Sequence, residues 1–116
     1  MGSVKDPEAL DRYRRVLIEL SHVTDYIVWE EGALDRLSRH LPGVGTRRIH
    51  ELMHNHAACN GKIDQVEETR EEFMWWKFHY DMRLSILGQR IYIETVLDDH
   101  EDVLDCVIHV VNIHPV

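Results

Sequence analysis

The clearest pattern in the chain is a strict alternation of apolar and polar residues that begins at Trp76. The apolar positions are Trp76, Phe78, Tyr80, Met82, Leu84 and Ile86. A period of two is typical of a strand with one buried and one solvent-facing side. A second alternating run, 90–97, follows a turn at Leu87-Gly88, and an apolar run, 107–113, follows a charged loop. These runs predict an antiparallel sheet.

The first two runs also predict their own pairing. A short loop centred on Leu87-Gly88 makes apolar residues oppose apolar ones and polar residues oppose polar ones, whereas a slip of one residue mixes the two faces. The expected pairs are Leu84 with Ile91 and Met82 with Ile93 on one face, and Arg83 with Tyr92 and Asp81 with Glu94 on the other.

Before Trp76 the apolar residues recur every three or four positions, as they do on one face of a helix. Asp6-Pro7-Glu8 predicts a helix start with Asp6 as N-cap, and the apolar stripe continues to Val23. Residues 33–41 predict a second helix. A third is expected to begin at Thr46, as its N-cap, and to end at the turn Asn60-Gly61.

Two segments keep alternative readings. The aromatic and β-branched run 26–29 is either a short strand or a continuation of the first helix. Residues 62–72 are either an edge strand or an exposed helix, because Ile63 and Val66 are their only apolar anchors.

The expected fold class is α+β, with N-terminal helices packed on one face of a C-terminal antiparallel sheet of three to four strands. Residues 1–116 form a single domain in this interpretation: a helix in 1–25, a short strand and two helices in 26–61, and the sheet in 62–116. A chain of 116 residues with 44% apolar and 29% charged residues suits one globular core.

The composition also favours a cytoplasmic protein without a membrane span. No apolar run approaches the roughly 20 residues of a spanning helix, and the N-terminus lacks the apolar segment of a secretory signal. Two cysteines are too few for a disulfide framework. The net charge of −8 means that any RNA contact depends on a local cluster of cations. It also suits a basic protein partner.

The polar face of the predicted sheet carries the candidate catalytic residues His79, Asp81, Arg83, Tyr92 and Glu94. Two opposed carboxylates repel each other unless a cation lies between them or one holds a proton. With a histidine and an arginine nearby, they are the components of a metal-free phosphodiester-cleaving site. A Glu or His removes the 2′-hydroxyl proton, Arg83 or Lys77 stabilises the phosphate, and His79 protonates the leaving oxygen. The alternative is a solvated face of mixed charge.

Two histidines on the last predicted strand extend this picture. Alternation places His109 on one face with Val107, Val111 and Ile113, as a core or interface histidine. His114 shares the other face with Asn112 and is expected to border the polar residues.

A competing motif lies on the third predicted helix. His50-Glu51-Leu52-Met53-His54 matches H-E-x-x-H, in which two histidines four residues apart bind Zn²⁺ and the glutamate acts on the bound water. His50 and His54 are therefore candidate zinc ligands and Glu51 a candidate base. The alternative is an amphipathic helix with Ile49, Leu52 and Met53 in the core and its histidines in solvent.

The order of elements over about residues 26–114 resembles the RelE-like toxin ribonucleases of bacterial toxin–antitoxin pairs, particularly the BrnT branch. Val28-Trp29-Glu30 stands where that branch has an aromatic strand ending Trp-Asp, and Ala33 and Arg39-His40 follow before Pro42-Gly43. The lysine and asparagine expected inside that helix are absent, with Gly32 and Arg36 near their places. The resemblance implies RNA cleavage without a metal cofactor, and an antitoxin-like protein partner.

Three hypotheses follow from the sequence. The first is a toxin-like, metal-independent endoribonuclease that acts through the sheet residues. The second is a small zinc-dependent hydrolase built on His50, Glu51 and His54. The third is a non-catalytic interaction module that binds a protein partner or forms a homodimer.

Overall fold

The computed structural model describes residues 5–23, 25–73 and 75–116 and has three helices and a five-stranded sheet. The elements are α1 (Pro7–Glu19), β1 (Ile27–Trp29), α2 (Glu31–His40), α3 (Thr46–Ala58), β2 (Asp64–Glu67), β3 (Phe78–Ile86), β4 (Gln89–Asp98) and β5 (Val107–Pro115), with short 3₁₀ turns at Glu71–Phe73 and Val103–Asp105. In the described residues, no helix is both long enough and apolar enough to cross a membrane.

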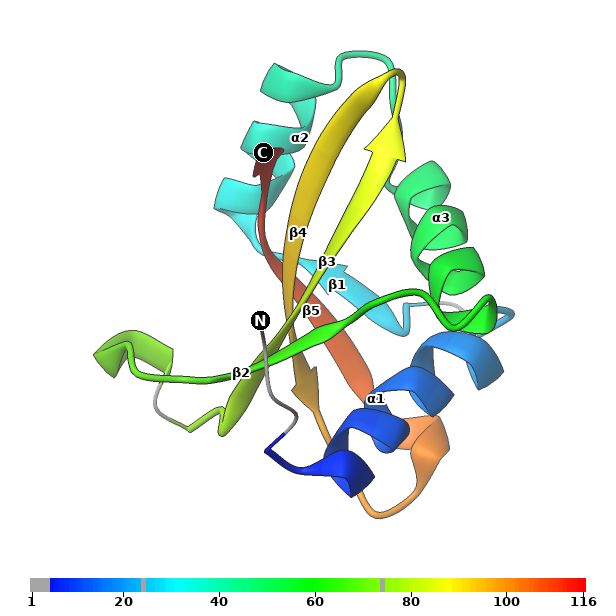
Figure 1. Cartoon of the computed structure of the whole chain (residues 1–116), viewed down its shortest axis with the longest axis vertical. Coiled ribbons are helices and arrows are strands. Elements are labelled where there is room, and N and C mark those ends of the chain that lie inside the picture. The colour runs from blue at the N-terminus through cyan, green and yellow to red at the C-terminus, as the bar shows by residue number, and fades with distance from the viewer. Residues whose placement is uncertain (1–4, 24, 74) are drawn as a thin grey trace.

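The strands lie in the order β1-β5-β4-β3-β2, and every neighbouring pair is antiparallel except β1 with β5 (Figure 1). The α+β class is thus as expected, but three to four strands was too low a number. Both ambiguous segments contain strands: Ile27–Trp29 pairs with β5, and Asp64–Glu67 pairs with β3. Each is only three or four residues long, so neither has enough alternating positions to be distinguished from a helix in the sequence.

The predicted register of the β3–β4 hairpin is confirmed in all four of its expected pairs. Leu87 and Gly88 form its two-residue loop, and both have positive φ, 50° and 76°. Such a loop matches the right-handed twist of the flanking strands, and glycine adopts positive φ without steric cost. The hairpin therefore fixes which side chains of β3 and β4 share a face.

A β-bulge in β5 changes which side chains of that strand share a face. Glu94 pairs with Asn112 whereas its neighbour Thr95 pairs with Val110, so Val111 is an extra residue in the bulged strand. An extra residue reverses the alternation on either side of it. The prediction that His109 shares a face with Ile113 was therefore wrong, because Ile113 continues the buried face of Ile108 and Val110.

The helices begin close to where the sequence placed them. Asp6 is the N-cap of α1, and its carboxylate accepts a hydrogen bond from the Ala9 amide. Thr46 was expected to cap α3, but the cap is Gly45 and Thr46 is the first helical residue. The third helix thus begins without a side-chain cap.

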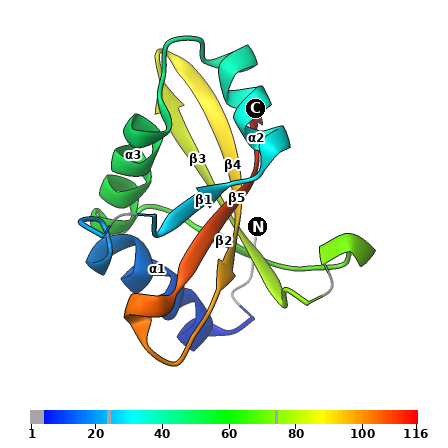
Figure 2. The same cartoon turned by 180° about the vertical axis from the view of Figure 1, so that it is seen from behind.

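In the described residues, buried side chains from the helices and from the sheet form one apolar core. Helix α1 packs on α3, α3 contacts β3, and α2 lies along β5 (Figures 1 and 2). The largest fully buried side chains are Tyr13, Leu17, Leu20, Leu41, Ile49, Met53, Met82, Ile91, Ile93, Ile108 and Ile113. Because these fill one face of β3 and β4, the intervening polar residues of both strands lie on the opposite face.

Candidate functional site

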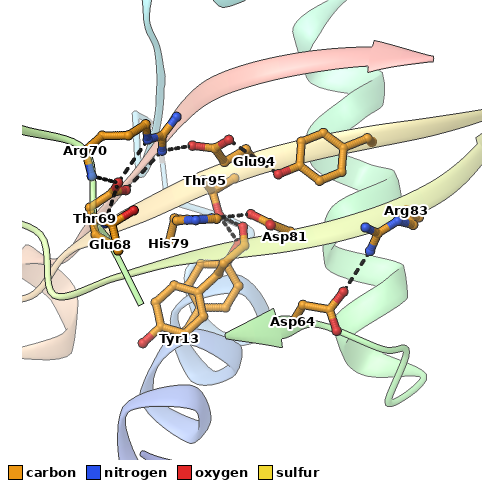
Figure 3. A network of polar contacts seen from close by, with 12 residues as sticks. Tyr13, Asp64, Glu68, Thr69, Arg70, His79, Asp81, Arg83, Glu94 and Thr95 are labelled. Atoms are coloured by element: carbon orange, nitrogen blue, oxygen red, sulfur yellow. Dashed lines mark hydrogen bonds and ion pairs between the residues drawn. The ribbon is translucent and has the colours of Figure 1, made fainter. Parts of the chain in front are cut away.

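A cluster of charged side chains lies on this opposite face, where β3 and β4 run side by side. His79 and Asp81 come from β3, and Glu94 comes from β4. Glu68 and Arg70 belong to the connection between β2 and β3, which brings them beside the two strands (Figure 3). Alternation within a strand and the confirmed pairing of Asp81 with Glu94 together bring the first three residues to one place.

His79 is oriented by Asp81. The distance between His79 Nδ1 and Asp81 Oδ1 is 2.7 Å, and an ionised carboxylate can only accept, so the proton of this bond sits on Nδ1. Nε2 is then the nitrogen that can exchange a proton with a bound molecule. Burial lowers the pKa of His79, but the hydrogen bond to Asp81 and the charges of Asp81, Glu94 and Glu68 outweigh it and raise the pKa overall.

Glu94 is held between two donors. The guanidinium of Arg70 binds Oε2 of Glu94, and the hydroxyl of Tyr92 donates to Oε1 over 3.3 Å. Asp81 and Glu94 are only 5% and 4% exposed, which is rare for carboxylates. Burial and the nearby charge of Asp81 raise the pKa of Tyr92, so its hydroxyl keeps the proton that it donates.

Arg70 is fixed in turn by Glu68. Its Nε and Nη2 atoms lie 2.9 and 3.0 Å from the two oxygens of Glu68, which makes a bidentate pair. The backbone amides of Thr69 and Arg70 also donate to Glu68 Oε1. The hydrogen bonds from Arg70 are the main reason that the pKa of Glu68 falls to about 2. This pair holds a positive charge over the edge of Glu94.

The sequence missed both Glu68 and Arg70. They lie in the segment 62–72, whose structure was left open, and they reach the site because β2 pairs with β3 and the chain then folds back. A signal that could have pointed to this segment is its one arginine among four glutamates: Glu67, Glu68, Glu71 and Glu72 surround Arg70.

Four of the five predicted catalytic residues, His79, Asp81, Tyr92 and Glu94, meet in this cluster, whereas Arg83 lies to one side of it. Arg83 Nη1 is 2.7 Å from Asp64 Oδ2 on β2, and its guanidinium carbon lies 5.4 Å from the centre of the Tyr92 ring. The cation in contact with Glu94 is Arg70 instead.

Aromatic and histidine side chains flank the cluster towards β5. The rings of Tyr92 and His114 are 4.9 Å apart, and those of Trp76 and His109 are 5.6 Å apart. The expectation that His114 borders the polar face is met by its pairing opposite Tyr92. His109 lies on this face too, as a result of the bulge.

The zincin-like motif occupies a different place, on α3. His50 Nε2 accepts a hydrogen bond from the Trp29 indole over 2.8 Å, and burial lowers the pKa of His50. His54 Nδ1 lies 3.1 Å from the carbonyl oxygen of Leu17. Together with Glu51 these residues line a cavity of about 700 Å³ between α3 and the segment before β1. One nitrogen of each histidine is thus already bonded to the protein.

The histidine and carboxylates of the sheet cluster are also arranged as metal ligands are. One ligand atom each from His79, Asp81 and Glu94 lies within 4.8 Å of the other two. In the part of the chain that the structure describes, no other group of three or more His, Cys, Asp or Glu residues meets this spacing. The motif on α3 therefore lacks a third ligand in the described residues.

Comparisons of the chain with protein-family models, with curated proteins and with solved structures gave no match. The likeness to the RelE-like toxins therefore stays a prediction, and the assignment of function depends on the chemistry of the site.

Proposed function

We propose that this protein is a metal-independent endoribonuclease of the toxin type, with its active site on the polar face of β3 and β4. The observation that carries the proposal is the contact chain Asp81–His79 beside Glu94–Arg70: a histidine oriented by a carboxylate, next to a second carboxylate bound by an arginine. These are a proton donor, a proton acceptor and a cation for the phosphate within one small area.

Each residue has a defined role in this scheme. Glu94 accepts the proton of a ribose 2′-hydroxyl, and the 2′-oxygen attacks the adjacent phosphorus. The bond from phosphorus to the 5′-oxygen breaks, and protonated His79 gives its Nε2 proton to that leaving oxygen. The products are a 2′,3′-cyclic phosphate and a 5′-hydroxyl end, so protons and electrons balance without an added reagent.

Two further residues support this chemistry. Arg70 stabilises the negative charge that grows on the phosphate oxygens, because its guanidinium is held at the edge of Glu94 by the bidentate pair with Glu68. Asp81 keeps the His79 proton on Nδ1 and stabilises the imidazolium, which favours the protonated form needed for the acid. Tyr92 positions Glu94 through its hydroxyl.

The net charge of −8 limits how such an enzyme binds RNA. Affinity cannot come from a broadly basic surface, so it depends on Arg70 and on stacking of bases against the aromatic and histidine rings beside the site. In this proposal an antitoxin-like partner covers the same face and blocks it.

The test is cleavage of a fluorescently labelled single-stranded RNA by the purified protein in the presence of EDTA. We expect 2′,3′-cyclic phosphate products, and a loss of about 10²-fold or more in rate for His79→Ala and for Glu94→Gln. His54→Ala and Glu51→Gln are matched controls on α3 and are expected to keep the wild-type rate. Expression of the wild-type protein, but not of His79→Ala, is expected to arrest growth.

The same four variants separate the other two hypotheses. Activity that is abolished by EDTA, by His54→Ala and by Glu51→Gln contradicts the proposal and favours the zinc-dependent hydrolase. If RNA stays intact, and if His79→Ala and wild type arrest growth equally or not at all, the cluster is a structural ion-pair network in a non-catalytic interaction module.

A further inference from the structure

The His79, Asp81 and Glu94 triad has an arrangement that its role as a set of acid and base groups does not require. Its ligand atoms come from two adjacent strands and lie within 4.8 Å of one another. Both carboxylates are more than nine-tenths buried, unlike the exposed acidic side chains that often cluster by chance. Adjacent strands also hold their backbone positions in the fixed register of the hairpin.

The donor set suits a transition-metal ion. One imidazole nitrogen and two carboxylate oxygens are ligands that Zn²⁺ accepts at about 2.0–2.2 Å. Ligand atoms at that radius in a tetrahedral site are about 3.4 Å apart, so closing the triad takes side-chain movements of about an ångström. Imidazole is a poor ligand for Mg²⁺, which favours Zn²⁺ over Mg²⁺.

The charge of the cluster also favours a cation. Glu68, Asp81 and Glu94 bring three carboxylates together around Arg70, which binds both Glu68 and Glu94. Asp81 and Glu94 stand directly opposite each other in the strand pairing, where like charges repel. A divalent ion between them neutralises both.

A separate observation beside the triad points to a bound group. The register places Asn112 of β5 next to Glu94 on β4, on the same face as the triad. The side-chain oxygen Asn112 Oδ1 is buried and has no hydrogen-bond partner among the residues that the structure describes. A buried acceptor without a partner is costly. Asn112 thus leaves an unpaired acceptor for a bound group in the position of β5 that pairs with Glu94.

We propose that His79, Asp81 and Glu94 bind one Zn²⁺ ion, which replaces the proton between His79 and Asp81 and competes with Arg70 for Glu94. Zinc binding by these residues does not require that the protein be a ribonuclease. Its consequence rests on the proposed ribonuclease activity: because the ion binds Glu94, the proton acceptor, and prevents His79 from forming the imidazolium that donates the proton, Zn²⁺ is an inhibitor of cleavage and chelation restores it.

Binding is tested by titrating ZnCl₂ into the EDTA-treated, dialysed full-length protein at pH 7.5 with isothermal titration calorimetry. Because the chain has nine histidines, the comparison with variants decides the result. We expect His79→Ala to lose one equivalent of bound zinc, and Asp81→Asn and Glu94→Gln to bind it at least about tenfold more weakly. His54→Ala, the matched control, is expected to bind as wild type does.

The opposite results overturn the site. Wild-type protein that binds no zinc contradicts it, as does zinc binding that survives His79→Ala and is lost in His54→Ala. Circular dichroism shows whether each variant is folded, and the isosteric Asp81→Asn and Glu94→Gln decide the question if His79→Ala is not. Titration with MgCl₂ is expected to give no heat from this site, and equal binding of Mg²⁺ and Zn²⁺ contradicts the assigned donor set.

The inhibitory consequence has its own measurement. If RNA cleavage occurs in EDTA, one equivalent of Zn²⁺ is expected to suppress it and excess EDTA to restore it. Zinc binding without any cleavage under either condition leaves the metal site standing and removes the proposed ribonuclease. Cleavage without zinc binding does the reverse, so the two failures are distinguishable.

Discussion

The two faces of the β3–β4 hairpin each carry a polar network. The two networks differ in their charge and in the part of the protein that shields them from solvent. On the core face the Tyr13 hydroxyl lies 2.5 Å from Thr95 Oγ1, and Thr95 Oγ1 donates to the carbonyl oxygen of Tyr80 over 2.8 Å. Since the Thr95 proton goes to Tyr80, Tyr13 donates to Thr95. Every proton of this network has an acceptor.

The core network is neutral and fully enclosed. Tyr13 and Thr95 have no exposed surface, and Tyr13 stacks on Tyr80 with ring centres 4.3 Å apart. Burial raises the pKa of Tyr13, so the hydroxyl stays protonated. The opposite network carries three carboxylates, Arg70 and His79, and its cover is the β2–β3 connection. A neutral network whose hydrogen bonds are all made within the protein stabilises one strand register. A charged network beside solvent is suited to bind charged molecules.

The largest expected effect is the difference in RNA cleavage rate between variants of Arg70 and of Arg83, the two arginines near the charged face. Arg70→Ala removes the cation in contact with Glu94, so we expect the cleavage rate to fall by about 10²–10³-fold. Arg83→Ala, the matched control, is expected to change the rate by less than about threefold because Arg83 pairs with Asp64 instead. The measurement is single-turnover cleavage of labelled RNA. Equal losses in the two variants contradict the assignment and restore Arg83 to the site.

On the core face the corresponding change affects stability. Thr95→Val keeps the side-chain shape but leaves the Tyr13 hydroxyl and the Tyr80 carbonyl without this partner. We expect the free energy of unfolding to fall by about 2–3 kcal/mol, measured by urea denaturation. Tyr13→Phe in the Thr95→Val background removes the stranded hydroxyl, so the double variant is expected to lose less than the sum of the single changes. Cleavage per folded molecule should stay unchanged, and a specific loss of activity contradicts the separation of the two faces.

The core face could be predicted from the sequence because its signal is local and repeated. The alternation from Trp76, the turn at Leu87-Gly88 and the matching of apolar with apolar residues fix one register, and that register brings Asp81 opposite Glu94. Four of the five predicted site residues therefore meet. These four side chains lie on β3 and β4, the same two strands whose alternation of apolar and polar residues fixes the register.

The rest of the site depends on interactions that have no period in the sequence. Arg70 reaches Glu94 only because the four-residue strand β2 pairs with the edge of β3 and the chain turns back over the hairpin. The place of His109 depends on the single extra residue Val111, which reverses the alternation of β5. Short strands and bulges are determined by tertiary contacts, so neither could be deduced from the spacing of apolar residues alone.

A smaller effect is the pH dependence of stability on the charged face. The pKa of His79 in the folded protein is raised above its ordinary 6.5, despite burial, by the hydrogen bond to Asp81 and by the charges of Asp81, Glu94 and Glu68. The protonated His79 therefore stabilises the fold fully below about pH 6.5, and this stabilisation is lost as pH rises through the folded pKa. Urea denaturation in EDTA from pH 5.5 to 9 should show the loss in wild type and not in His79→Gln. A wild-type curve that rises relative to His79→Gln over this range contradicts the assigned direction.

The smallest effect concerns the ion pair at the margin of the charged face. Arg83 is 41% exposed and Asp64 14% exposed, so solvent screens their interaction. We expect Asp64→Asn and Arg83→Ala to lower the free energy of unfolding by about 0.5–1 kcal/mol each, with little further loss in the double variant. Raising the salt concentration should shrink the difference, because screening weakens exposed pairs. A loss as large as that of Thr95→Val would contradict the expectation that solvent screens this pair.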